Sequence, residues 1–289
     1  MKTVTALLEG IIDYAGLFPP AALSLREAVA NYAAYRAQPE SWMLGRLILP
    51  LSRLDQFEPP ADGAPWPLSV LGTADLDADL KLIGHFNERF GQDRARIEAI
   101  EIKAATTEEI DRLAGRIPAD LACFVEIPIE NDPAPLLRAL AQAGIQAKVR
   151  TGGVTAEAIP SAPDLARFLV CCAAEDLPFK ATAGLHHPLR SRQRLTYEAE
   201  SPSATMHGFL NLFLAAAFAQ TGMEAGEVTE LLDEASPEAF RFEMDSVFWR
   251  DRMAVVAHVR NMRHLFALSF GSCSFVEPVA ELRQLGLIP

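Results

Sequence analysis

The stretch CFVEIPIENDPAPLLRALAQAGIQAKVRTGG (residues 123–153) decides the fold class, because it contains two short apolar runs separated by a helical pattern. The first run, CFVEIP, covers residues 123–128, and the second, AKVRT, covers residues 147–151. Both have the length of a strand, and neither has a hairpin partner nearby in the sequence. A strand, a helix and a second strand in this order are typical of a parallel sheet.

The same alternation extends from residue 13 to about residue 184. The further strand candidates are residues 14–18, 46–50, 68–72, 97–103, 179–183 and, after a long interval, 266–271. Lys103, Glu126 and Lys148 follow one another at steps of 23 and 22 residues, a spacing that suits a β/α barrel. We therefore predict an α/β fold of the TIM (β/α)8 barrel type, in one domain over residues 1–289.

Helix signals lie between the strand candidates. Capping-box spacings are present at Ser24 with Glu27, at Ser161 with Asp164 and at Ser274 with Glu277. After Ser161, apolar side chains recur at the spacing of a helix that lies on a sheet, at Leu165, Phe168, Leu169 and Cys172. These signals support helices that cover a parallel sheet.

Residues 188–265 are too many for one strand–helix repeat, so we predict a helical insertion between strands seven and eight. We expect helices around 206–220 and around 246–264, on the side of the barrel where loops build active sites. The first contains MHGFLNLFLAAAFA, in which Asn211 is the one polar side chain of the central turn. Such a helix must be covered by the following helices or by another subunit, which makes a homo-oligomer one of the possible outcomes.

Strand periodicity predicts that charged side chains point into the barrel. In IEAIEIK, Ile100 and Ile102 share one face, and Glu101 and Lys103 share the other. Because the apolar face of a barrel strand meets the helices, the charged face points inward. The interior ionisable side chains predicted in this way are Glu101, Lys103, Glu126, Lys148, Arg150 and Lys180. Burying so many charges is costly, so they indicate either a functional site or a satisfied ion-pair network that closes the barrel.

Several segments resemble 2-deoxyribose-5-phosphate aldolases and related class I aldolases, over roughly 200 residues in order. The segments are IIDYAGLFPPAALSLREAV (11–29), LILP (47–50), FVEIPIEND (124–132), LLRALAQAGIQAKVRTGG (136–153), FKATAGL (179–185) and FGSCSF (270–275). The Lys-x-x-Thr-Gly pattern of that family is matched by Lys148, Thr151 and Gly152, and its second lysine by Lys180. The chain departs from the family in the length of the segment before FGSCSF and at Arg150, where the aldolases carry a small residue.

The resemblance implies a class I aldolase or lyase that forms a Schiff base with a small oxo-compound. An amine must be neutral to attack a carbonyl, whereas free lysine has a pKa near 10.4. A neighbouring cation in a partly closed site disfavours the ammonium form, and we expect Lys180 and Arg150 to act in this way on Lys148. Glu101 or Glu126 would move protons, directly or through water. The spacing leaves open which of the two lysines is the nucleophile.

The substrate is expected to be anionic, and it is phosphorylated in one interpretation. FGSCSF resembles the turn that receives a phosphate in those aldolases, and backbone N–H groups at a helix N-terminus form a favourable anion site. An ordinary capped helix is the other interpretation of this turn. The expected substrate-binding residues are Lys103, Arg150, Thr151, Gly152, Thr182, His186, His187, Gly271, Ser272 and Ser274.

Two other functions remain open. The adjacent His186 and His187 could contact substrate, or one of them could complete a divalent-metal site with Glu101 and Glu126 in a metal-assisted lyase, isomerase or hydrolase. A non-catalytic barrel that binds a small anion is the third possibility, and it needs no neutral lysine. We expect neither a metal ion nor another cofactor, because Schiff-base chemistry requires none.

Composition excludes several classes of partner. The chain of 289 residues carries a net charge of -12, which disfavours attraction to nucleic acid or to anionic lipid. Its longest apolar run, residues 208–219, is shorter than the roughly 20 residues that span a bilayer. Glu9 and Asp13 interrupt the apolar region that a signal peptide would need, so we interpret the protein as cytoplasmic. The four cysteines show no metal-binding or disulfide spacing and are expected to be reduced thiols.

Overall fold

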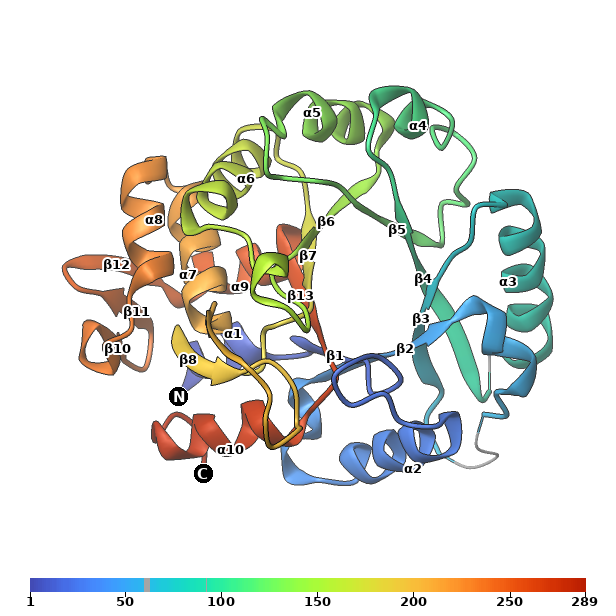
Figure 1. Cartoon of the computed structure of the whole chain (residues 1–289), viewed down its shortest axis with the longest axis horizontal. Helices are drawn as coiled ribbons and strands as arrows, with labels where there is room; N and C mark the ends of the chain where they lie inside the picture. Colours follow the sequence, from blue (N-terminus) through green and yellow to red (C-terminus); the bar gives the residue numbers. More distant parts are fainter. Residues whose placement is uncertain (60–62, 92) are drawn as a thin grey trace.

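Eight parallel strands form a closed barrel in the computed structural model, which describes residues 1–59, 63–91 and 93–289. The strands, in the order in which they pair around the barrel, are β1 (Ile12–Tyr14), β13 (Ala267–Ser272), β7 (Phe179–Thr182), β6 (Gln146–Arg150), β5 (Ala122–Glu126), β4 (Ala95–Lys103), β3 (Trp66–Leu71) and β2 (Leu44–Pro50). Figure 1 shows helices placed around this ring of strands. The predicted TIM barrel is therefore confirmed.

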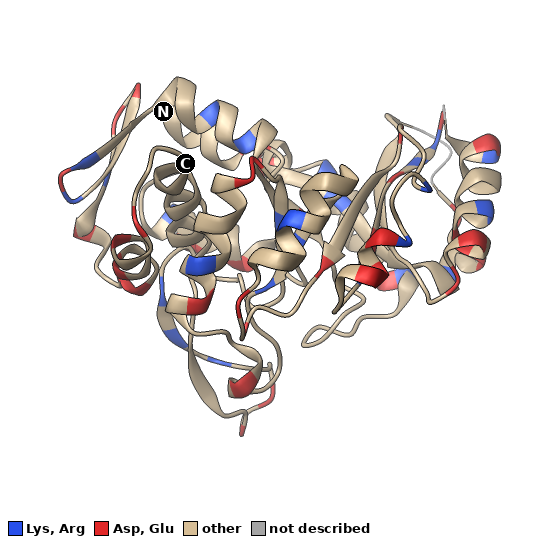
Figure 2. Ribbon diagram, turned by 90° about the horizontal axis from the view of Figure 1, so that it is seen from above, with Lys and Arg blue, Asp and Glu red and all other residues tan. Residues whose placement is uncertain are grey.

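The outer helices follow the strands along the chain. They are α1 (Lys2–Leu8), α2 (Leu25–Arg36), α3 (Leu76–Phe90), α4 (Thr107–Asp111), α5 (Ala134–Ala143), α6 (Ala162–Ala174), α7 (Phe209–Gln220), α8 (Ala225–Asp233), α9 (Val256–Leu265) and α10 (Val276–Gln284). Ser24 and Glu27 form a complete capping box at the start of α2. The predicted apolar stripe of α6, which includes Leu165 and Phe168, is buried against the barrel. In Figure 2, positions of Lys and Arg alternate with positions of Asp and Glu along several of these helices.

The first strand lies earlier in the chain than the sequence indicated. The structure places β1 at Ile12–Tyr14, whereas the apolar pattern predicted residues 14–18. The chain turns after Tyr14, because the backbone N–H of Phe18 bonds back to the carbonyl of Ala15. Asp13 is consequently a strand residue, and its side chain is buried inside the barrel.

The segment between β7 and β13 is only partly helical. Two antiparallel strands, β8 (Ser191–Arg194) and β9 (Ser203–Met206), form a hairpin directly after β7. A second antiparallel sheet contains β10 (Phe240–Phe242), β11 (Ser246–Trp249) and β12 (Arg252–Val255). The helix predicted at 246–264 is therefore wrong over its first ten positions. Alternate burial of Val247 and Trp249 fits a strand.

Helix α7 belongs to the ring of helices around the barrel. Its residues Phe209 and Phe213 pack on Phe270 of β13, with ring centroids 5.1 and 6.0 Å apart. Helices α6, α8 and α9 contact its other sides, which explains why the helix is apolar nearly all round. The sequence left open whether the following helices or another subunit cover this helix, and in the structure α6, α8, α9 and the barrel cover it within one chain. The insertion reaches the active-site face through residues 193–197 of the hairpin. Among the described helices, none is long and apolar enough to cross a membrane.

Candidate active site

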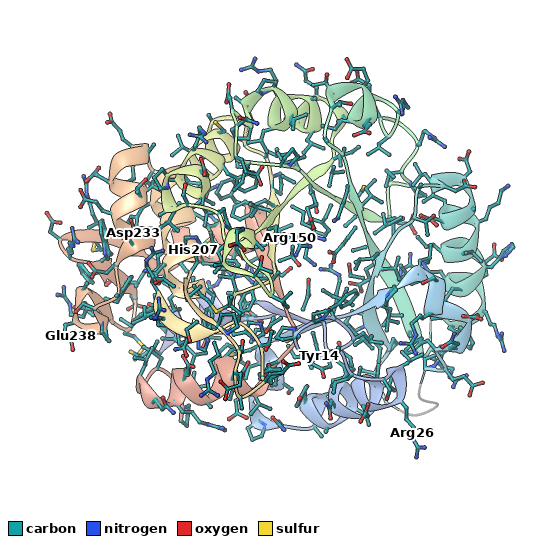
Figure 3. All side chains as sticks on the ribbon, viewed as in Figure 1. Tyr14, Arg26, Arg150, His207, Asp233 and Glu238 are labelled. Carbon is teal, nitrogen blue, oxygen red and sulfur yellow. The ribbon has the colours of Figure 1, made fainter. Side chains whose placement is uncertain are left out.

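A pocket of about 600 Å³ opens at the C-terminal ends of the barrel strands. Its floor and walls include Glu101, Lys148, Arg150 and Thr182, which come from β4, β6 and β7. The β8–β9 hairpin adds a further wall with residues 193–197. This is the end of a β/α barrel at which active sites are built. Figure 3 shows Arg150 near the barrel opening.

A buried chain of ion pairs lies below this pocket. Glu101 receives Lys148 Nζ at 2.8 Å on one carboxylate oxygen and Lys180 Nζ at 2.7 Å on the other. Lys180 also donates to Asp13 at 2.7 Å, and it lies 5.3 Å from the centre of the Phe124 ring. The interior direction predicted for Glu101, Lys148 and Lys180 agrees with this structure, since all three side chains are buried.

Hydroxyl and backbone donors complete the buried network. Ser69 Oγ donates to Glu101 at 2.7 Å, and Ser269 Oγ donates to Asp13 at 2.8 Å. The backbone N–H of Arg46 donates to the second oxygen of Asp13 at 2.8 Å. Buried charges persist only when they are paired and hydrogen-bonded in this way.

Glu126 links the buried network to the pocket rim. Lys148 Nζ lies 3.0 Å from one of its oxygens, and Arg150 Nε donates to the other at 3.1 Å. Lys103 also approaches Glu126, at 3.5 Å, but its own side chain is 75% exposed. Lys103 and Arg150 were predicted to lie inside the barrel. Both lie at the C-terminal ends of their strands and reach Glu126, and Arg150 lines the pocket, but both side chains are exposed rather than buried.

The ion pairs fix the charge state of the network. Burial alone raises the pKa of Glu101, but the ammonium groups of Lys180 and Lys148 outweigh it and hold the pKa well below its usual range. Burial opposes the charge of Lys180, and Asp13 and Glu101 overcome it and raise its pKa. Burial likewise raises the pKa of Glu126, but the charges of Lys148 and Arg150 have the larger effect, so the pKa lies below its usual range. Lys180 and Arg150, the cations expected to disfavour the ammonium form of Lys148, are therefore themselves paired with carboxylates. The sequence analysis had expected their repulsion to act on Lys148 without such pairing.

The two lysines differ in their access to the pocket. Lys148 lines the pocket, whereas Lys180 is fully buried and reaches only the interior carboxylates. They are in register on neighbouring strands, with Lys148 opposite Lys180. Of this pair, Lys148 is the amine that a bound molecule can reach.

The loops after β6 and β7 are held together by residues that were predicted from the sequence to bind substrate. The hydroxyl of Thr151 donates to the carbonyl of Ala183 at 2.5 Å. Gly152 and Gly184 pass so closely that a Cβ on Gly152 would lie 2.8 Å from Gly184 Cα. Thr151 and Gly152 thus have a structural role in the turn, and Thr182 beside them lines the pocket.

The serines of the GSCS turn satisfy one another. Ser272 Oγ donates to the carbonyl of Ser274 at 2.7 Å, and Ser274 Oγ accepts the backbone N–H of Glu277 at 3.2 Å. Gly271 and Cys273 line the pocket, whereas Ser272 and Ser274 do not. The turn therefore caps the start of α10, and the carboxylate of Glu277 lies beside the pocket at the place where the sequence suggested a phosphate.

The adjacent histidines bind different carboxylates. His186 Nδ1 contacts Glu277 at 2.9 Å, and His187 Nδ1 contacts Glu281 at 2.6 Å. Both histidines line the pocket, whereas Glu126 is not among the residues that line it. Within the described ranges, no three His, Cys, Asp or Glu side chains are grouped so that they could hold a metal ion.

Comparison of the chain with protein-family models, with curated proteins and with solved structures finds no match.

Several residues of the site escaped the sequence analysis. Asp13 was concealed by the misplaced first strand, and its only signal was the Ile-Asp pair in the segment that resembles aldolases. Tyr197, Cys273 and Glu277 line the pocket from the hairpin, from the turn after β13 and from α10. Nothing in the local sequence connects these three segments, because only closure of the barrel brings them together.

Proposed function

We propose that the protein is a carbon–carbon lyase or aldolase in which Lys148 forms a Schiff base with a small oxo-compound. The observation that carries the proposal is the position of Lys148, whose amine lies at the pocket wall and is paired with Glu101 and Glu126. The β/α barrel is a fold that commonly carries enzymes, and its active sites lie at this end.

Schiff-base formation at Lys148 leaves the charge of the site unchanged, which favours this reaction at the lysine. Condensation of an ammonium group with a carbonyl releases water and gives an iminium group, which carries the same single positive charge. The carboxylates of Glu101 and Glu126 neutralise Lys148 and would neutralise the iminium equally well. The site therefore needs no change in its ion pairs when the covalent intermediate forms.

Lys148 must release a proton before its nitrogen can attack. Of its two carboxylate partners, Glu126 is less buried than Glu101 and can pass a proton toward the pocket rim. The Glu126 oxygen that faces Lys148 makes no hydrogen bond within the described structure. We assign Glu126 the role of taking this proton, directly or through water, and Glu101 that of a fixed counter-charge. Lys180 holds Glu101 in place from below and is too buried to meet substrate.

Cleavage then follows from the electron demand of the iminium. A base removes the proton of a hydroxyl group two carbons from the imine carbon, the carbon–carbon bond breaks, and its electron pair enters the iminium to give an enamine. The first carbonyl product leaves at this point. Protonation of the enamine and addition of water release the second product and return Lys148 to its starting form.

Reductive trapping tests the proposal directly. The protein is incubated with propanal and sodium borohydride, which converts an imine to a stable secondary amine, and the modified lysine is found by peptide mass spectrometry. The lysines of the chain are Lys2, Lys81, Lys103, Lys148 and Lys180, so each is assigned without ambiguity. We expect rapid modification of Lys148 at low aldehyde concentration and slower modification of exposed Lys103, which serves as the internal control.

Two variants complete the experiment. Lys148→Arg keeps the positive charge of the network and removes the nucleophilic amine, so rapid trapping should disappear. Lys103→Arg should leave it unchanged. If Lys148 is modified no faster than Lys103, the proposal is wrong, and the network serves only to close a barrel that binds its ligand without a covalent bond.

A further inference from the structure

A second group of reactive side chains lines the same pocket. Cys273 Sγ lies 3.8 Å from His186 Nε2, and His186 Nδ1 lies 2.9 Å from Glu277 Oε2. The imidazole thus contacts a thiol with one nitrogen and a carboxylate with the other. A nucleophile, a base and a group that orients the base form the same arrangement in enzymes that activate a thiol or a hydroxyl.

Tyr197 closes this group from the β8–β9 hairpin. Its hydroxyl donates to Glu277 Oε2 at 3.1 Å and lies 3.7 Å from Cys273 Sγ. Burial is the main factor that raises the pKa of Tyr197, and Cys273 and Glu277 raise it further, so the phenol stays protonated. A proton donor is therefore held beside the sulfur.

Two further phenols interact with the sulfur electrostatically. They are Tyr14 of β1 and Tyr35 of α2. Burial is the main factor that raises the pKa of each, to about 12 for Tyr14, so both are neutral at physiological pH. Of the two side chains whose contacts with the Cys273 sulfur the described structure gives, His186 is the one that can carry a positive charge.

We propose that Cys273 is a nucleophile, held as a thiolate by His186 and Glu277, that binds an aldehyde in the pocket as a reversible hemithioacetal. The pocket of about 600 Å³ has room for a small oxo-compound, and Cys273, His186 and Tyr197 all line it. This site is separate from Lys148 and does not depend on the function proposed for that residue.

The addition is balanced without any other reactant. The sulfur forms a bond to the carbonyl carbon, and the carbonyl π electrons move to the oxygen. The oxygen takes the proton that His186 carries on Nε2, which leaves a neutral imidazole. No atom is oxidised or reduced, and the reverse steps release the aldehyde unchanged.

The environment of His186 agrees with such an ion pair. Burial by itself lowers the pKa of this imidazole, but its contacts with Cys273 and Glu277 outweigh burial and raise the pKa to about 9. The other thiols lack a comparable partner. Burial raises the pKa of Cys123, Cys171 and Cys172, which favours the unreactive neutral form in each of them.

Alkylation of the native protein by iodoacetamide tests the proposal. The rate at each cysteine is followed by peptide mass spectrometry from about pH 5 to about pH 9, with the half-buried Cys171 as internal control. A free thiol has a pKa near 8.5 and is only about 3% thiolate at pH 7, whereas an imidazolium-paired thiol titrates lower. We expect Cys273 to react at least about tenfold faster than Cys171 at pH 7.

Variants identify the cause of the reactivity. His186→Gln should slow alkylation of Cys273 on the order of tenfold. Glu277→Gln should have a smaller effect in the same direction. If His186→Gln does not fold, the wild-type profile decides alone. A rate at pH 7 no faster than that of Cys171 would overturn the proposal.

The carbonyl ligand is tested by protection. Propanal should slow the alkylation of Cys273 both in the wild type and in Lys148→Arg, which cannot form the imine at position 148. Protection in the wild type alone would mean that the aldehyde binds only through Lys148, and the hemithioacetal would be excluded. Absence of imine trapping together with protection of Cys273 would instead remove the function proposed for Lys148 and leave the thiol site standing.

Discussion

Lys148 and Lys180 stand opposite each other on neighbouring strands, and one carboxylate, that of Glu101, binds both amines. The bridge explains how two cations are tolerated side by side in the interior. It also divides their roles, since Lys148 remains at the pocket wall and Lys180 is fully enclosed.

Removal of the bridging charge should be strongly destabilising. Glu101→Gln leaves two buried ammonium groups without their shared partner, and loss of one member of a buried ion pair costs about 3–5 kcal/mol. Glu98→Gln on the same strand is the matched control, because its pair with Arg46 is partly exposed and contributes less than about 1 kcal/mol. Urea unfolding measures both variants, and equal stability for the two would contradict the account of the network.

Stability should decrease at alkaline pH because of His186. Its folded pKa of about 9 lies above the unfolded value of about 6.5, so the contribution is complete below about pH 6.5 and is lost as the pH rises through about 9. The loss amounts to at most about 3.5 kcal/mol, because a pKa displaced by one corresponds to about 1.4 kcal/mol. Urea unfolding of wild type and His186→Gln at about pH 6 and about pH 9 should show a smaller pH effect in the variant.

The control for this measurement is His264→Gln, because His264 is exposed. That variant should keep the full pH dependence of the wild type. If the pH dependence of stability is unchanged in His186→Gln, a group other than His186 causes the loss of stability at alkaline pH.

Arg194 should select anionic aldehydes. It lines the pocket, whereas Arg192 is exposed outside it and Arg190 is paired with Asp233 at 3.0 Å. Arg194→Ala should reduce imine trapping with glycolaldehyde phosphate more than with glycolaldehyde, and the difference should shrink at high salt, which screens exposed charges. Arg192→Ala is the control, and an equal effect of the two substitutions would show that the pocket has no local preference for an anion.

The hairpin should be replaceable, but the whole segment between β7 and β13 should not. Replacement of residues 191–206 by a short glycine–serine linker leaves α7 on Phe270, so the protein should stay soluble and its pocket should open. Deletion of residues 189–260 removes α7 and exposes the barrel wall, so it should give insoluble protein. Expression and size-exclusion chromatography distinguish these outcomes, and a soluble long deletion would show that α7 is peripheral.

The barrel could be predicted from the sequence because its strands and helices are encoded locally. The period of two in IEAIEIK and the helical stripe of α6 are properties of short windows, and both are confirmed. The inward direction of Glu101, Lys148 and Lys180 follows from the same period. Prediction failed where a short motif was ambiguous, as at β1, where the turn after Tyr14 determines the end of the strand.

The second reactive group was beyond local patterns. Cys273 and His186 are separated by 87 positions, and Tyr197 and Glu277 by 80. The adjacent histidines were noticed, but their partners come from α10, whose position is set by barrel closure. The segment at 246–255 was misread for a related reason, since within the described residues its strands pair only with each other and with β10.

The interior ion pairs also bear on the order in which the chain can fold. Asp13 and Lys180 are 167 positions apart, and Glu101 and Lys180 are 79 apart, so the charges meet only when the first and seventh strands have joined the fourth. A half-barrel would hold unpaired charges in its core and would gain little from strand pairing until the ring closes. We therefore expect the barrel to assemble in one concerted closing step. In that step, the charged side chain of the last strand to arrive neutralises the charges that are already in the interior.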